Sequence, residues 1–328
     1  MKKLCRLVLI ILIIALTSAL WGCFAPRQQT HSDAFLAMGT TIAVSLTATE
    51  KDAQLHFAQL REIARRYDAA FSAGEASSQL HKFNANVTQS LELSGDLAAV
   101  IILAFELHTL TNGAFDPTLR PLIELWDIKI STAPPSGGEI EQALAHCGID
   151  KFNLVSEGDK LTVTKNDPAA GLDLGAIAKG ALLDAMMGYL DGNVSGALLS
   201  IGGSSVGALG TKSGGVPYRV GVRNPENTSE NYMALDLSEG KTLSVSGNYQ
   251  QYFEHGGAIY HHIMNPSTGQ PAEAVGFQSV AAVLPRGHNS GAIGDALSTA
   301  FFVMGEAAAR ELIASGALGE GIDIYFYR

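Results

Sequence analysis

One apolar segment near the C-terminus constrains the fold more than any other feature of the sequence. Residues 292–304 read Ala-Ile-Gly-Asp-Ala-Leu-Ser-Thr-Ala-Phe-Phe-Val-Met, which predicts an apolar helix with a single carboxylate, Asp295, inside it. A helix that is apolar all round is buried, and a buried charge is costly unless it is paired or bound to a metal. The chain must therefore provide both a core around this helix and a partner for Asp295.

The rest of the chain predicts an α+β fold with helices packed on a sheet. Glycine makes up 35 of the 328 residues, and from residue 171 onward short strands alternate with glycine-rich turns. Helical periodicity and caps predict helices over 51–71, 94–111, 139–147, 289–304 and 306–314. Alternation predicts strands over 40–47 and 322–327 and a hairpin of 152–155 with 161–164. A boundary between two parts is compatible with the proline- and glycine-rich stretch near 130–150.

The N-terminus has the features of a secretory signal peptide. Three basic residues precede the apolar run 7–16, and Leu20-Trp-Gly-Cys23 resembles a bacterial lipobox, although Trp21 is unusual there. We expect a signal peptide over 1–22, a lipidated Cys23, and a lipid-anchored tether over 23–32. The protein would then lie in the cell envelope, held to the membrane and facing the periplasm. An uncleaved membrane anchor and a plain secreted protein are the alternatives.

Charge and cysteine content narrow the function. The net charge of −10 argues against a general nucleic-acid binder. Cys5 would leave with the signal peptide and Cys23 would carry lipid, so Cys147 is left without a partner for an intramolecular disulfide.

Asp295 and Thr299 form the first candidate site. They are four residues apart, so both oxygens lie on one face of the predicted helix. A carboxylate and a hydroxyl suit a hard cation such as Mg²⁺, which commonly takes its other ligands from water and phosphate oxygens. In the alternative interpretation, Asp295 bonds a backbone amide or an arginine and Thr299 bonds back to its own helix.

The segment 171–184 predicts a strand, a glycine turn and a helix that starts near Ile177, with Lys179 close to the helix start. These are the parts of a phosphate-binding site. The spacing of a Walker A loop is absent, and so is a dinucleotide fingerprint. An ordinary strand, turn and helix with a surface lysine is the alternative.

Two further segments carry candidate residues. His261 and His262 are neighbours on a predicted strand, so only one of them can face a given site, where it could serve as a general base. A structural histidine is the alternative. Phe115 and Asp116 could offer a flat apolar face and an acceptor to a ring system; a core phenylalanine followed by an Asp-Pro turn is the alternative.

Taken together and in this order, the motifs resemble the ApbE family of FAD:protein FMN transferases, over roughly residues 35–327. The matching segments are Met38-Gly-Thr40, Phe71-Ser72 with Ser78 to Asn84, Gly113-Ala-Phe-Asp-Pro-Thr118, Asp173-Leu-Gly-Ala-Ile-Ala-Lys-Gly180 with Asp184, Gly202-Gly203, Ser246-Gly-Asn-Tyr249, His262-Ile-Met-Asn-Pro-Ser-Thr-Gly269 and Asp295-Ala-Leu-Ser-Thr299.

The resemblance implies an ApbE-type fold over 33–328, with a T-fold-like core and a flavin cleft between two subdomains. It also implies a Mg²⁺-dependent reaction in which FAD is the substrate, AMP leaves, and FMN is esterified to a threonine or serine of a partner protein. Typical partners are flavin-acceptor subunits of Nqr- and Rnf-type membrane redox complexes.

The resemblance also assigns residues to roles. The metal ligands would be the Ala176 carbonyl, Asp295 and Thr299. His262 would be the base, with His261 left open, and Lys179 would assist catalysis. The FAD contacts would be Met38, Ala114, Phe115, Asp116, Asp173, Lys179 and Ile263.

Two positions depart from the family. Ala73 stands where some members carry an aromatic ring, and Asn265 stands where an aspartate is more usual. An FAD pyrophosphatase that releases FMN and AMP, and a non-catalytic flavin-binding lipoprotein, remain the alternatives.

Overall fold

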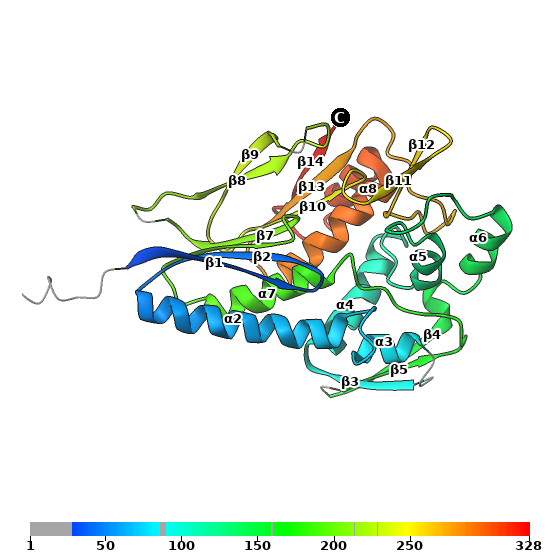
Figure 1. The fold of residues 1–328 in the computed structure, drawn as a ribbon, viewed down its shortest axis with the longest axis horizontal. Helices are drawn as coiled ribbons and strands as arrows, with labels where there is room; N and C mark the ends of the chain where they lie inside the picture. Colours follow the sequence, from blue (N-terminus) through cyan, green and yellow to red (C-terminus); the bar gives the residue numbers. More distant parts are fainter. Residues whose placement is uncertain (1–27, 86–89, 159, 213, 228) are drawn as a thin grey trace, which may run out of the picture.

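A computed structural model describes residues 28–85, 90–158, 160–212, 214–227 and 229–328. They form a seven-stranded antiparallel sheet with helices on one face, and a smaller part beside it (Figure 1). The strands of the large sheet lie in the order β1-β2-β6-β7-β10-β13-β14, and their bounds are Gln29–Ala37, Thr40–Ala48, Gly196–Ile201, Ser205–Gly210, Thr242–Gly247, Ser279–Leu284 and Asp323–Tyr327.

Three helices cover one face of this sheet: α2 (Glu50–Phe71), α7 (Ala178–Leu190) and α8 (Ser290–Ala314). The hairpin of β8 (Tyr218–Arg223) and β9 (Asn231–Leu237) packs on the other face, against alternate residues of β7, β10 and β13. Because side chains alternate along a strand, the intervening residues of these three strands point toward the helices.

The smaller part contains a three-stranded sheet of β3 (Ser90–Ser94), β5 (Lys160–Lys165) and β4 (Phe152–Glu157), which packs against α4 (Gly95–Leu110). Its other elements are α3 (Gln79–Asn84), α5 (Arg120–Trp126), α6 (Gly137–Leu144) and a 3₁₀ turn (Ile149–Lys151). Since β3 pairs with β5, the chain on both sides of 130–150 belongs to one sheet, and no domain boundary falls there. One hydrophobic core joins both parts. A short hairpin, β11 (Tyr252–His255) with β12 (Ala258–His261), completes the fold.

The α+β class and most predicted elements are confirmed, and three details are corrected. Residues 29–32, expected in the tether, belong to β1, which pairs with β2 along its whole length. The expected strand before α7 is a single bridge from Gly171 to Leu119. The helix expected over 139–147 ends at Leu144, and its Ser136 capping box starts it two residues earlier.

The break expected between two C-terminal helices is present within α8, where Gly305 has a non-helical φ of 82°. Among the described residues, no helix combines the length and the apolar character needed to cross a membrane. The predicted signal peptide and Cys23 lie outside the described residues.

Helices α7 and α8 cross where two glycines meet. A Cβ at Gly180 would lie 2.0 Å from the carbonyl oxygen of Gly291, and a Cβ at Gly291 would lie 2.6 Å from that of Gly180. Any side chain at either position would therefore force the two backbones apart. This crossing fixes the start of α7 against the start of α8.

We expect Gly180→Ala to destabilise the protein strongly, because its methyl group would overlap backbone atoms of α8 that cannot move aside. The matched control is Gly188→Ala on the same helix, where a Cβ would meet no atom within 4 Å. This control should gain about 0.5–1 kcal/mol from helix propensity. Urea unfolding of both variants measures the difference in their free energies of unfolding. Equal stability of the two variants would contradict the close packing of Gly180 against Gly291.

Candidate active site

Asp295 lies at the α7–α8 crossing with three hydrogen-bond donors around it. The Gly180 N–H donates to Oδ2 at 2.7 Å, and the hydroxyls of Ser205 and Ser244 both donate to Oδ1 at 2.7 Å. The residue is only 5% exposed. Burial raises the pKa of Asp295, while the charge of Lys179 and these three donors act to lower it.

Asp184 makes the reciprocal contact from α7 to α8. Its two carboxylate oxygens accept from the Gly291 and Ala292 N–H groups at 2.7 and 2.8 Å. These are first-turn amides of α8, which have no partner within their own helix. Burial raises the pKa of Asp184 to about 7 despite the two amide donors, and the nearby charge of Asp295 adds to the rise.

Thr299 points toward the same strand as Asp295. Its Oγ1 is 3.1 Å from the hydroxyl of Ser246, which also lies 2.8 Å from the hydroxyl of Ser298. Strand β10 therefore supplies Ser244 to Asp295 and Ser246 to Thr299, two residues apart on one face. The predicted pair of ligands does share one helix face. Asp295 bonds a backbone amide, as the alternative interpretation expected, whereas the Thr299 hydroxyl bonds Ser246 and not its own helix among the described residues.

Asp173 and Ala176 lie in the segment just before α7, and Lys179 is the second residue of that helix. The Asp173 Oδ1 accepts from the Gly175 N–H at 2.8 Å, and its Oδ2 lies 3.8 Å from Arg120. The Lys179 ammonium is 3.5 Å from the Gly175 carbonyl. Its positive charge acts to lower the pKa of Asp295 and contributes to the lowering of the pKa of His262.

The two histidines differ in how their ring nitrogens are used. His261 is 5% exposed; its Nε2–H donates to the Ala272 carbonyl at 3.0 Å, and its Nδ1 accepts from the Ile263 N–H at 3.3 Å. His262 is half-buried, and its Nδ1–H donates to the Gln251 carbonyl at 3.3 Å. The Nε2 of His262 thus carries the lone pair, and it has no hydrogen-bond partner in the described part of the chain. This favours His262 over His261 as the candidate base.

Burial lowers the pKa of His262 to about 4, and the charges of Lys179 and Lys129 contribute to the lowering. The imidazole is therefore neutral at pH 7, which is the form that can accept a proton.

Two of the predicted flavin contacts have buried side chains. The ring of Phe115 is 3% exposed and belongs to the main core, and Ile263 is 4% exposed in a second cluster with Phe302. The Asp116 Oδ1 accepts from the N–H and hydroxyl of Thr118. Of the two interpretations left open by the sequence, the structure matches the core phenylalanine followed by an Asp-Pro turn, and the Phe115 ring has no open face.

Met38 and Ala114 are partly buried against the main core. Met38 and Gly39 form the β1–β2 turn, both with positive φ. The Gly202 N–H, in the β6–β7 turn, donates to the Thr41 carbonyl at 2.9 Å, so the two glycine turns lie side by side.

Sequence reasoning missed Ser205, Ser244 and the Gly180–Gly291 contact. The serines lie 90 and 51 residues before Asp295. Their signal was the placement of small polar residues at alternate positions in otherwise apolar strands, as in Ser244-Val-Ser246.

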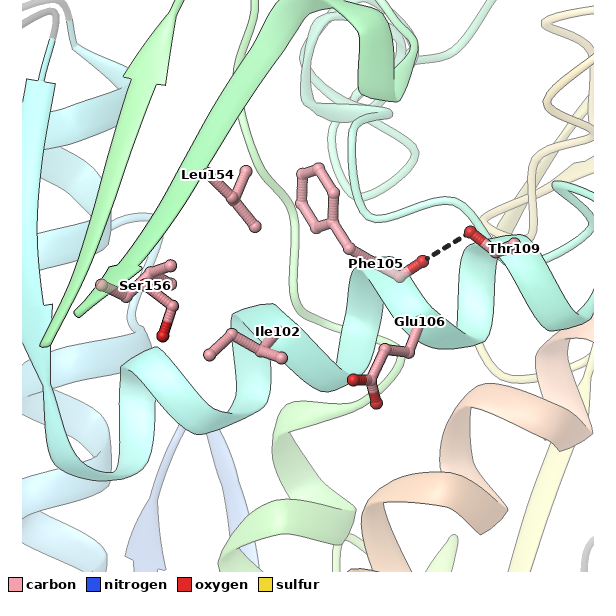
Figure 2. Close-up of a pocket in the computed structure, with 7 residues that line it drawn as sticks. Ile102, Phe105, Glu106, Thr109, Leu154 and Ser156 are labelled. Carbon is pink, nitrogen blue, oxygen red and sulfur yellow. Dashed lines mark hydrogen bonds between the residues drawn. The ribbon is translucent and has the colours of Figure 1, made fainter. Parts of the chain in front are cut away.

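A hollow of about 390 Å³ lies elsewhere, between α4 and the β4–β5 hairpin (Figure 2). Four apolar side chains line it together with Glu106, Thr109 and Ser156, and none of the predicted site residues is among them. Asp184, Asp295 and Lys179 lie at the α7–α8 crossing instead.

Comparison with known proteins places the chain in a family. The profile of the ApbE family matches residues 38–326. A Haemophilus influenzae protein named FAD:protein FMN transferase is 31% identical over 288 residues, covering 84% of this chain and 81% of its own. A Treponema pallidum protein of the same name is 31% identical over 295 residues, covering 85% and 80%.

The solved structure of an ApbE protein from Thermotoga maritima aligns with a TM-score of 0.79 and 29% identity, over 91% of this chain and 94% of that one. The fold thus defines an ApbE-type α+β protein with a polar site at a helix crossing. The chain belongs to the ApbE family, which confirms the resemblance found in the sequence.

The raised pKa of Asp184 predicts a pH dependence of stability. The folded protein binds the carboxyl proton of Asp184 more tightly than the unfolded chain does. The contribution of this proton to the free energy of unfolding is therefore fully present below pH about 4 and is lost as pH rises through about 7. In urea unfolding, the free energy of unfolding of Asp184→Ala should fall less between pH 4 and pH 7 than that of the wild-type protein. It should also lose about 1–2 kcal/mol with the α8 cap.

Asp191→Ala at the C-cap of the same helix is the control, because that carboxylate forms an exposed ion pair with Arg286. It should lose less than about 1 kcal/mol. If the free energy of unfolding of Asp184→Ala changed with pH in parallel with that of the wild type across pH 4–7, Asp184 would not titrate in this range.

Proposed function

We propose that this chain is an FAD:protein FMN transferase. It would cleave FAD to AMP and FMN and attach the FMN through a phosphoester bond to a threonine or serine of a flavin-acceptor subunit of an Nqr- or Rnf-type redox complex. Family membership supports the proposal. The structural observation that carries it is that α8 presents the buried Asp295 carboxylate to the first turn of α7, where Lys179 immediately precedes the Gly180 N–H that binds it.

The residues present fit a Mg²⁺ ion. Asp295, Thr299 and the Ala176 carbonyl are all oxygen donors, which hard cations prefer. The buried Asp295 carboxylate makes no ion pair within 4 Å in the described part of the chain, although its environment opposes a buried charge. When bound, Mg²⁺ would supply charge neutralisation at the pyrophosphate.

The other groups at the crossing have separate tasks in this proposal. The pyrophosphate is anionic and the protein is acidic, so binding needs a local positive region. Lys179 and the N-terminal end of α7 provide one. The Nε2 of His262 would accept the proton of the acceptor hydroxyl, because its Nδ1–H is held by the Gln251 carbonyl. A flavin cleft between the two parts of the chain would keep water from competing with that hydroxyl.

The proposal is tested by incubating the full chain with FAD, Mg²⁺ and a candidate acceptor subunit, followed by intact mass measurement of the acceptor. We expect a gain of one FMN. His262→Ala should lower the rate about 10²–10⁴-fold, as loss of a general base does. His255→Ala should leave the rate unchanged, since His255 is an exposed residue of β11 that bonds the Thr132 carbonyl.

Other outcomes identify the alternative functions. Free FMN and AMP formed at the same rate without any acceptor would indicate an FAD pyrophosphatase. Tight FAD binding with no AMP release over hours, unaffected by His262→Ala, would indicate a non-catalytic flavin-binding lipoprotein.

We further propose that the mature protein is anchored through a lipid, such as palmitate, on Cys23 and faces the periplasm. An alkyne-labelled palmitate should label the wild-type chain, and Cys23→Ser should abolish both the label and membrane sedimentation. Cys147→Ser is the control, because burial raises the pKa of this thiol to about 12 and makes it unreactive. A mature mass that still contains residues 1–22 would indicate an uncleaved anchor instead.

A further inference from the structure

The hydrogen bonds around Asp295 distinguish its two carboxylate oxygens. Oδ1 accepts from two hydroxyls, those of Ser205 and Ser244, each at 2.7 Å. Oδ2 accepts only from the Gly180 N–H, also at 2.7 Å. Each carboxylate oxygen has two lone pairs. Oδ1 is therefore saturated, whereas Oδ2 keeps one lone pair for another partner.

The two serines are fixed in place by the sheet. Ser205 and Ser244 are register partners on the adjacent strands β7 and β10, and both side chains are fully buried. Both lie on the helix-facing side, because the residues next to them, Val206 and Leu243, pack against the β8–β9 hairpin. A carboxylate held from two neighbouring strands and from the start of α7 has a single orientation.

We propose that Ser205 and Ser244 are positioning residues that present only Oδ2 of Asp295 to a divalent cation. This assignment rests on the proposed metal site and adds to it a preference for Mg²⁺ over Ca²⁺. A carboxylate that offers one oxygen suits Mg²⁺, which needs near-octahedral coordination. Ca²⁺ accepts more ligands and commonly takes both oxygens of a carboxylate. The serine pair thus favours the smaller ion by occupying Oδ1.

The test uses the full chain in detergent with FAD present, and Mn²⁺ as a paramagnetic probe of the site. The dissociation constant of Mn²⁺ is measured by the electron paramagnetic resonance of the free ion, and that of Ca²⁺ by competition. The Ser205→Ala/Ser244→Ala double variant should bind Mn²⁺ about 10–100-fold more weakly, the usual cost of losing residues that orient a metal ligand. The ratio of the Ca²⁺ to the Mn²⁺ dissociation constant should fall, because Oδ1 becomes free.

Ser279→Ala is the matched control. Ser279 is a fully buried serine on the neighbouring strand β13, and its hydroxyl has no hydrogen-bond partner in the described part of the chain. It should bind both ions as wild type does. Thermal unfolding of each variant reports folding separately, and the two single-serine variants give the same test if the double variant does not fold.

Three results would overturn the proposal. A Mn²⁺ dissociation constant within twofold of wild type, with lowered thermal stability, would mean that the serines only satisfy a buried charge. An unchanged ratio of the Ca²⁺ to the Mn²⁺ dissociation constant would show that the serines do not restrict the cation to Oδ2 of Asp295. Equal Mn²⁺ binding by wild type and Asp295→Asn would show that Asp295 is not a ligand of the metal. The gain of FMN mass by the acceptor tests the transferase proposal separately from this result.

Discussion

The contact between the starts of α7 and α8 is the constraint on which the rest of the site depends. The two backbones meet at Gly180 and Gly291, and each helix sends a carboxylate to the unpaired amides of the other. Asp295 and Asp184 are therefore placed where helix N-termini carry positive partial charge. One contact thus gives hydrogen-bond partners to the first-turn amides of two helices and hydrogen-bond donors to two buried carboxylates.

The sheet adds the second half of the site through its two-residue period. On β10, Leu243 and Val245 pack against the β8–β9 hairpin, whereas Ser244 and Ser246 point toward α8 and meet Asp295 and Thr299. A small hydroxyl at these positions leaves room for α8 to pack closely and still donates a hydrogen bond. The apolar face of β10 packs against the β8–β9 hairpin, and its opposite face carries the two serines that meet the candidate site residues.

Much of this arrangement could be predicted from the sequence. The apolar helix with Asp295 and the amphipathic α2 follow from periodicity, and Asp295 with Thr299 follows from helix geometry. The partners of Asp295 could not be predicted, because Ser205 and Ser244 meet only through strand register. Strand β1 was missed because its first residues are polar, as an edge strand allows. Phe115 could not be assigned to core or ligand, since both environments favour an aromatic ring.

Electrostatics explain why a site built from such ordinary contacts can carry chemistry. Burial raises the pKa of Asp295, and the charge of Lys179 acts against this rise. The same charge helps to hold His262 neutral, in addition to the larger effect of burial. A cation site needs an ionised carboxylate, and a general base needs a neutral imidazole. One ammonium group thus favours the required form of both residues at neutral pH, although their own environments shift the two pKa values in opposite directions.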